Sequence, residues 1–207
     1  MNFYISDLHL GQDELFYTLT PTERVSTEEI IEAINSRCNR HDTLYVVGDI
    51  SGYGVKAYQY VKRLKPKLVL VVGNHDHAIL KSKKLRGLFE EITTQKYLTD
   101  KVKGEGVDLL LSHYPIIQWD GYYKGRWLFY GHIHDMRSVE LYNRTTPTAI
   151  NVGVDRIGPA PMTAEELILQ RKEQFKWLTK EQFAALYQEK PNIEPRNTRK
   201  VLDTNWF

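Results

Sequence analysis

The feature that most restricts the fold of this 207-residue chain is a set of five short apolar segments, each followed closely by histidine, aspartate or asparagine. The segments are 2–6, 43–47, 67–72, 107–112 and 127–130. They are followed, in that order, by Asp7 and His9; by Asp49; by Asn74, His75 and Asp76; by His113; and by His132 and His134. Apolar runs of this length predict buried β-strands. Because the carboxyl ends of parallel strands point to one side of a sheet, these polar side chains are expected to meet at one edge.

The segments between the strands predict the rest of the architecture. Helical periodicity covers 26–39 and 55–64, and Ser26 with Glu29 has the spacing of a capping box. After residue 91 the chain is rich in strands: a hairpin turned at 104–106 is followed by short strands at 127–130, 138–142 and 148–152. We therefore predict an α/β fold, a two-sheet β-sandwich flanked by helices (αββα).

The C-terminal part predicts one more packed helix and then an appended tail. Thr163 and Glu166 form a second possible capping box, which opens a helix over 163–174. A further helix is expected at 179–190, and the remaining residues contain two prolines and little periodicity. The predicted organisation is one domain over 1–174 and a C-terminal helix with an extended tail over 175–207.

Composition excludes some classes of protein. The formal net charge of +2 is too small to favour a nucleic-acid partner on charge alone. The single cysteine, Cys38, cannot form an internal disulfide, which fits a reducing compartment. No apolar run is long enough to span a membrane, and the first residues do not resemble a signal peptide. We expect a cytoplasmic protein that does not contact a membrane; an oligomeric state cannot be predicted.

The polar residues at the strand ends are metal-binding types. Imidazole suits zinc, iron or nickel, and carboxylate and carbonyl oxygens suit manganese or magnesium. One structural metal typically takes four ligands, so a larger set indicates two metals with one shared ligand. Asp49 is the expected bridge, because a carboxylate has two oxygens and Gly48 before it allows a tight backbone turn. The predicted ligands are Asp7, His9, Asp49, Asn74, His113, His132 and His134.

Six short motifs make the chain similar to the calcineurin-like metallophosphoesterase superfamily. They are SDLHLG, VVGDIS, VVGNHD, LSHYP, YGHIH and INVGVD, in this order within residues 1–160. They most resemble the small single-domain phosphoesterases of bacteria and phages. The resemblance to serine/threonine protein phosphatases is weaker, because GDISGYG lacks their Asp-Arg pair and Asp76 stands where they have glutamate. Gln12 also stands where many close relatives have histidine, which puts a substrate or auxiliary contact in question.

The resemblance implies a cofactor and a role for each site residue. It implies two divalent metal ions, with Mn²⁺ expected and Fe, Zn, Ni or Mg as alternatives. One metal would be held by Asp7, His9, Asp49 and His134, and the other by Asp49, Asn74, His113 and His132. His75 would lie near the leaving group as general acid, or would hydrogen-bond the bound phosphate. Asp76 would fix the tautomer of His75, cap the following helix, or do both.

The expected function is hydrolysis of phosphate esters, with phosphodiesters preferred, by attack of a metal-bridging hydroxide. A phosphomonoesterase and a nuclease of the same fold remain alternatives. The basic segment KSKKLR at 81–86 is compatible with a nuclease, although a solvated helix face explains it as well. A non-catalytic scaffold is disfavoured, because every predicted ligand is present.

An aromatic segment after His113 gives the prediction for the substrate. Residues 114–127 read YPIIQWDGYYKGRW, which places aromatic and cationic side chains near one predicted ligand. Aromatic faces stack on bases and cations hold phosphates, so a small nucleotide-like ester is expected, and a nucleic-acid strand is not favoured. The predicted substrate contacts are Tyr114, Trp119, Tyr122, Lys124 and Arg126.

Overall fold

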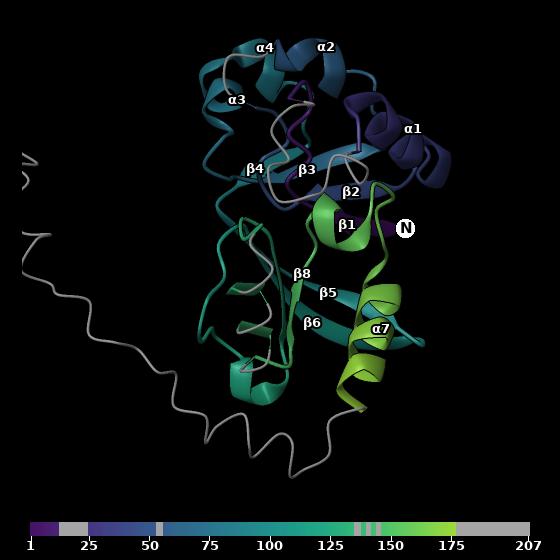
Figure 1. Ribbon diagram of the computed structural model, residues 1–207, viewed down its shortest axis with the longest axis vertical. Helices are drawn as coiled ribbons and strands as arrows, with labels where there is room; N and C mark the ends of the chain where they lie inside the picture. Colours follow the sequence, from purple (N-terminus) through teal and green to yellow (C-terminus); the bar gives the residue numbers. More distant parts are fainter. Residues whose placement is uncertain (13–24, 53–55, 135–137, 140–141, 144–145, 177–207) are drawn as a thin grey trace, which may run out of the picture.

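The predicted αββα sandwich is present in the computed structural model, which describes residues 1–12, 25–52, 56–134, 138–139, 142–143 and 146–176. Two four-stranded sheets pack face to face, and helices lie outside them (Figure 1). No helix in the described part of the chain has the length and apolar character needed to cross a membrane. The predicted helix at 179–190 and the tail lie outside the described residues.

The first sheet is entirely parallel. Its order is β1 (Asn2–Ile5), β2 (Thr43–Val46), β3 (Lys67–Val71) and β4 (Glu91–Thr93). Four helices follow or precede these strands: α1 (Thr27–Arg37), α2 (Ala57–Val61), α3 (His77–Lys81) and α4 (Lys83–Arg86). Strand β4 was not predicted, because its three half-buried residues are too few to show a pattern.

The second sheet is mixed. Its order is β5 (Gln95–Val102), β6 (Glu105–Ser112), β7 (Trp127–Tyr130) and β8 (Ala149–Asn151). Strands β5 and β6 are antiparallel, whereas β6, β7 and β8 are parallel to one another. The predicted hairpin is present, but its turn lies at Lys103 and Gly104, where φ is 52° and 85°. Positive φ at both residues is what the type I′ form of a two-residue hairpin turn requires.

The core has three parts, one between the sheets and one on the outer face of each sheet. Between the sheets, Tyr4 of β1 stacks on Tyr45 of β2 at 5.2 Å between ring centroids and meets the ring of Phe129 of β7 edge-on at 5.0 Å. On the other face of the first sheet, alternate residues such as Leu44 and Leu70 pack against the outer helices. Because both faces of the first sheet are buried, its strands read as continuous apolar runs in the sequence.

Helix starts were predicted more accurately than short strands. Ser26 and Glu29 form the predicted capping box of α1, and Thr163 and Glu166 form the same reciprocal bonds at the start of α7 (Ala164–Lys176). The predicted strand at 138–142 is wrong, because residues 138–139 and 142–143 are helical. Five residues with alternating polarity fit a strand and a helical turn almost equally well. The predicted domain end at 174 stays a prediction, and α7 continues two residues past it.

Candidate metal centre

Backbone hydrogen bonds bring the strand ends of both sheets together. The amide of Asp7 donates to the carbonyl of Gly48 at 3.0 Å, which joins the ends of β1 and β2. The amide of Ser6 donates to Val152 at 2.8 Å, so the end of β1 also reaches the end of β8 in the other sheet. The amide of Gly131 donates to His113 at 3.0 Å and joins the ends of β6 and β7. The polar residues after these strands therefore lie in one place.

Carboxylate, imidazole and amide groups converge there at ligand-like distances. Asp49 Oδ2 lies 3.4 Å from His113 Nε2 and 4.0 Å from His9 Nε2. Asp7 Oδ1 lies 3.7 Å from His134 Nε2. The side-chain oxygen of Asn74 lies 3.0 Å from ring nitrogens of both His113 and His132. All seven predicted ligands are thus neighbours.

Three overlapping groups could each hold a cation. Within each group the potential ligand atoms lie within 4.8 Å of one another. Asp7, His9 and Asp49 each belong to two of the groups, and His75, which was not predicted as a ligand, belongs to one of them. The groups are Asp7, His9 and His134; His9, Asp49 and His75; and Asp7, Asp49 and His113.

The backbone at the site is strained. Among the described residues, five non-glycine residues have positive φ, and four of them are predicted ligands: Asp7 (57°), His9 (41°), Asp49 (55°) and His132 (70°). This region is unfavourable for residues with a side chain and concentrates at functional sites. The strain is tolerated because surrounding hydrogen bonds hold these turns, and it aims short side chains at a common point.

Glycine is required where two ligand carboxylates press against the backbone. A Cβ on Gly73 would lie 2.3 Å from Asp49 Oδ1, and one on Gly131 would lie 2.3 Å from Asp7 Oδ2. Both distances are far below van der Waals contact, so any side chain would displace a carboxylate. The glycines of the VVGNHD and YGHIH motifs therefore make room for the metal-binding groups.

Asp76 acts on the backbone of the site. Its fully buried carboxylate accepts hydrogen bonds from the amides of Asp49 (2.9 Å), Gly73 (2.8 Å) and Ile50 (3.0 Å). The expectation that its side chain caps α3 is wrong, because it makes no cap hydrogen bond there. Asp76 instead ties the turn after β3 to the turn after β2, and so fixes the strained conformation of Asp49.

The structure adds a residue that had no predicted role. Asp155, on the short helix α6 (Val154–Ile157), has a buried side chain whose Oδ2 lies 3.3 Å from His134 Nδ1. Its neighbour Arg156 donates to the backbone carbonyl of His134. A carboxylate on the far nitrogen orients an imidazole and strengthens its other nitrogen as a ligand. The only sequence signal was the last residue of INVGVD.

The charges of the site influence one another. Burial raises the pKa of Asp7 to about 6 and lowers the pKa of His9 to about 4. Burial would also lower the pKa of His113, but its hydrogen bond with Asp49 and the charges of Asp7 and Asp49 raise it to about 9. The pKa of His134 is raised chiefly by its hydrogen bond with Asp155. A cation bound at His113 or His134 has to displace a proton, so metal affinity should fall as the pH falls.

The residues present fit divalent cations. The site brings imidazole and carboxylate donors close together, and a strained backbone holds them there. Such mixed donors are typical of metal sites. A model of the calcineurin-like phosphoesterase family matches residues 3–203. The chain belongs to this family.

A solved structure supports the same fold for this phosphoesterase family member. A protein of unknown function from Aquifex aeolicus, AQ665, is 25% identical, with a TM-score of 0.62, and the match covers 82% of this chain and 98% of that one. No curated protein matches the chain. The family therefore indicates a hydrolase of phosphate esters, and the substrate has to be inferred from the site itself.

The predicted substrate contacts separate into different environments. Tyr114 is 48% exposed, and its ring centroid lies 4.6 Å from that of His132. Trp119 is buried, and its indole N–H donates to the carbonyl of Arg126 at 3.0 Å. Tyr122 packs edge-on against Trp119 at 4.8 Å. Tyr114 therefore lies beside the candidate metal centre, while Trp119 and Tyr122 hold the loop together.

The two predicted cationic contacts also differ. Arg126 pairs with Asp120 and Asp108 and lies 5.1 Å from the ring of Tyr97, on the β5–β6 hairpin. Lys124 is exposed at the end of the 3-10 helix Tyr122–Lys124. Arg126 is thus committed to neighbouring side chains, and only Lys124 presents a cation to solvent.

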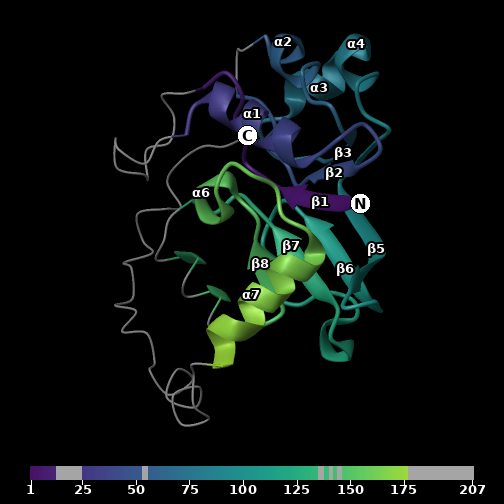
Figure 2. The same ribbon diagram turned by 90° about the vertical axis from the view of Figure 1, so that its right-hand side faces the viewer.

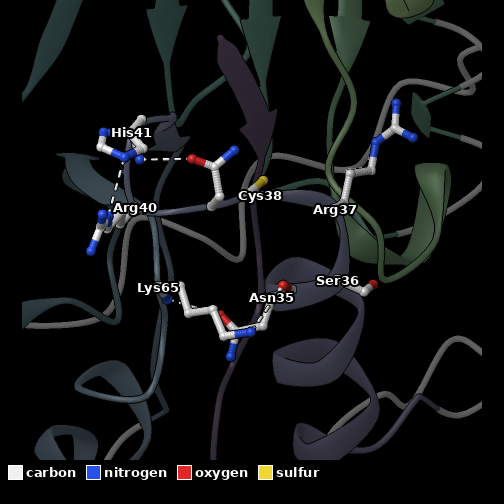
Figure 3. A pocket seen from close by; sticks show the side chains of 8 residues that line it. Asn35, Ser36, Arg37, Cys38, Arg40, His41 and Lys65 are labelled. Atoms are coloured by element: carbon white, nitrogen blue, oxygen red, sulfur yellow. Dashed lines mark hydrogen bonds between the residues drawn. The ribbon is translucent and has the colours of Figure 1, made fainter.

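A separate hollow lies at the amino end of β2, where α1 leads into this strand, and not at the carboxyl ends where the site lies (Figure 3). Its polar groups bind one another: Lys65 N–H donates to Asn35 Oδ1 at 2.8 Å, and Arg40 Nε donates to His41 Nε2 at 3.1 Å. Arg37 extends away from it toward Pro161 and Glu166. None of the candidate metal ligands lines this hollow, so it is not part of the site.

Proposed function

We propose that the protein is a dinuclear metal-dependent phosphoesterase that hydrolyses phosphodiesters of nucleotide-like substrates in the cytoplasm. The observation that carries the proposal is the position of Asp49, whose Oδ2 lies 4.0 Å from His9 Nε2 and 3.4 Å from His113 Nε2, the histidines expected at different metals. A shared carboxylate is what two adjacent cations require. Asp7, His9 and His134 would complete the first metal position, and Asn74, His113 and His132 the second.

When bound, two divalent cations supply Lewis acidity toward the phosphate oxygens and acidify water to give a nucleophile near neutral pH. The chain's own residues then orient the ester and manage its protons. His75 is half-buried, its amide donates to Asp49 Oδ1 at 2.7 Å, and its ring lies 4.9 Å from that of His9. This position suits a general acid that protonates the departing alkoxide, a contribution of about 10²–10⁴-fold.

The preference for a diester rests on what surrounds the site. In the described part of the chain, no second domain covers the strand ends to select a small monoester. Tyr114 offers a half-exposed aromatic face beside His132, where the second ester substituent of a nucleotide diester can stack. Base–aromatic stacking contributes about 1–3 kcal/mol per base, so Tyr114 is expected to matter for nucleotides and little for simple esters.

The test compares bis-nitrophenyl phosphate with mono-nitrophenyl phosphate in the presence of Mn²⁺, with metal analysis of the purified protein. We expect a higher kcat/KM for the diester. Tyr114→Ala should lower kcat/KM for a dinucleotide by about 5–150-fold, the equivalent of one lost stacking contact. Tyr123→Ala is the matched control, because Tyr123 is 84% exposed on the same loop. A preference for the monoester would identify a phosphomonoesterase and exclude this proposal.

Loss of the Asp155 carboxylate is expected to weaken metal binding without removing a ligand. Asp155→Asn leaves a side chain of the same size beside His134 Nδ1, but removes the charge that strengthens Nε2 as a donor. Removing such a partner typically costs about 10–100-fold in metal affinity. Calorimetric titration of the metal-free protein with Mn²⁺ measures this directly, without relying on turnover.

Asp120→Asn is the control for that measurement, since Asp120 is an exposed carboxylate that pairs with Arg126. It should leave the Mn²⁺ affinity unchanged. Equal affinities for wild type and Asp155→Asn would contradict the orienting role of Asp155.

A further inference from the structure

The positive charge of the chain is concentrated in one segment. Over the whole sequence the net charge is only +2, but residues 51–89 carry nine lysines and arginines and one acidic residue, the buried Asp76. This segment therefore has a formal charge of +8, and the rest of the chain is acidic. The basic residues are Lys56, Lys62, Arg63, Lys65, Lys67, Lys81, Lys83, Lys84 and Arg86.

The fold gathers much of this charge on one surface. Helices α2, α3 and α4 lie side by side at one end of the molecule in both views (Figures 1 and 2). Five lysines on or next to these helices are exposed, and they form what we call the basic surface: Lys56, Lys62, Lys81, Lys83 and Lys84. The ammonium groups of Lys84 and Lys62, from α4 and the end of α2, lie 3.9 Å and 5.7 Å from the ring centroid of Tyr58.

The charges of the basic surface are not neutralised by neighbouring acids. Arg63 pairs with Glu28, and Lys67 Nζ lies 3.5 Å from Glu90 Oε1, so these two cations of the segment have partners. None of the five lysines forms an ion pair with a carboxylate among the residues that the structure describes. The ammonium groups of Lys62 and Lys84, which both lie against the ring of Tyr58, repel each other, and a bound polyanion would relieve that repulsion.

The helices α3 and α4 of the basic surface directly follow the candidate metal centre in the sequence. Helix α3 begins at His77, two residues after His75, and ends at Lys81. One helical turn separates these ends, a rise of about 6 Å. Lys83 and Lys84 follow on α4, which packs against both α3 and α2. A strand with one phosphate at the metal centre can therefore place its next phosphates along the lysines.

We propose that the basic surface binds the phosphate backbone of a single-stranded nucleic acid whose phosphodiester is held at the metal centre. The inference rests on the proposed function and specifies its nucleotide-like phosphodiester as part of a polynucleotide. Several separated ammonium groups match a chain of regularly spaced phosphates, whereas a single nucleotide would leave most of them unused. Backbone contacts of this kind give binding that is independent of sequence and weakens with salt.

The first test measures binding alone. Lys81, Lys83 and Lys84 are replaced together by glutamine, and the matched control replaces Lys101, Lys103 and Lys172, three exposed lysines on the β5–β6 hairpin and α7. A fluorescent single-stranded oligonucleotide of about 12 nucleotides is titrated in the presence of EDTA at several salt concentrations. The affinity of the first variant for the oligonucleotide should fall at least about tenfold, and its slope of log K against log salt concentration should become less steep by about 2. The control should match wild type in both.

The second test separates this inference from the proposed function. The ratio of kcat/KM for the oligonucleotide to that for bis-nitrophenyl phosphate should fall about tenfold or more in the Lys81/Lys83/Lys84 variant and stay constant in the control. If the wild-type protein did not hydrolyse bis-nitrophenyl phosphate, the proposed function would be wrong. The binding titration would still test the inference about the basic surface. Equal oligonucleotide binding by wild type and variant would overturn it. So would binding of wild type to phosphatidylglycerol vesicles without binding to the oligonucleotide.

Discussion

Replacing Asp49 with asparagine is expected to abolish metal binding and phosphoester hydrolysis together. Asp49 is buried, its Oδ2 lies 3.4 Å from His113 Nε2, and its carboxylate is shared by two ligand groups. Asparagine is neutral and offers one oxygen, so two adjacent cations would repel each other without the bridging charge. Loss of a residue that only orients a ligand lowers metal affinity about 10–100-fold, so loss of the shared ligand should lower it by more than that.

Metal content per chain and kcat/KM for bis-nitrophenyl phosphate measure the effect of Asp49→Asn. Asp120→Asn controls for the loss of one carboxylate on the surface. Thermal unfolding of the metal-free proteins checks that the variant folds, because the amide of Asp49 keeps its bond to Asp76 whatever the side chain. Full metal occupancy with normal turnover would show that Asp49 is not the bridge.

The architecture was predictable where residues form long or locally defined patterns. The apolar runs of β1, β2 and β3 are buried on both faces, and the caps at Ser26 and Thr163 depend only on residues three positions apart. Strand β4 was missed because its three half-buried residues are too few to show a pattern. The segment 138–142 was assigned wrongly, because local alternation does not determine what a short segment packs against.

The site was predictable only as far as chain topology determines it. Parallel strands of one sheet end on one side, so the convergence of Asp7, Asp49 and Asn74 followed from their positions after β1, β2 and β3. Asp155 reaches His134 because β7 and β8 pair with Tyr130 opposite Asn151, and no local pattern indicates that register. Similarly, no local signal distinguishes the buried Trp119 from the half-exposed Tyr114, since burial depends on how the loop folds back on β6 and β7.

Replacing His75 with asparagine is expected to leave metals bound and lower the rate. The bond from His75 to Asp49 Oδ1 is made by the backbone amide, so it survives any change of side chain. The variant therefore keeps the geometry of Asp49 and loses a proton donor worth about 10²–10⁴-fold in rate. The loss should be largest for esters with poor leaving groups, which need protonation, and smallest for activated nitrophenyl esters.

The dependence on leaving group distinguishes the two roles considered for His75. A general acid gives a large loss on an unactivated alkyl diester and a small one on bis-nitrophenyl phosphate. A residue that only hydrogen-bonds the phosphate oxygens gives equal losses on both, because those oxygens are the same in each substrate.

The control variant is His41→Asn, because His41 is an exposed histidine at the amino end of β2, and it should match wild type on both esters. Retained metal content in His75→Asn is needed for either conclusion, since His75 also belongs to a ligand group with His9 and Asp49. Equal losses with metals retained would therefore assign His75 to phosphate binding, and a loss of metal would make it a ligand.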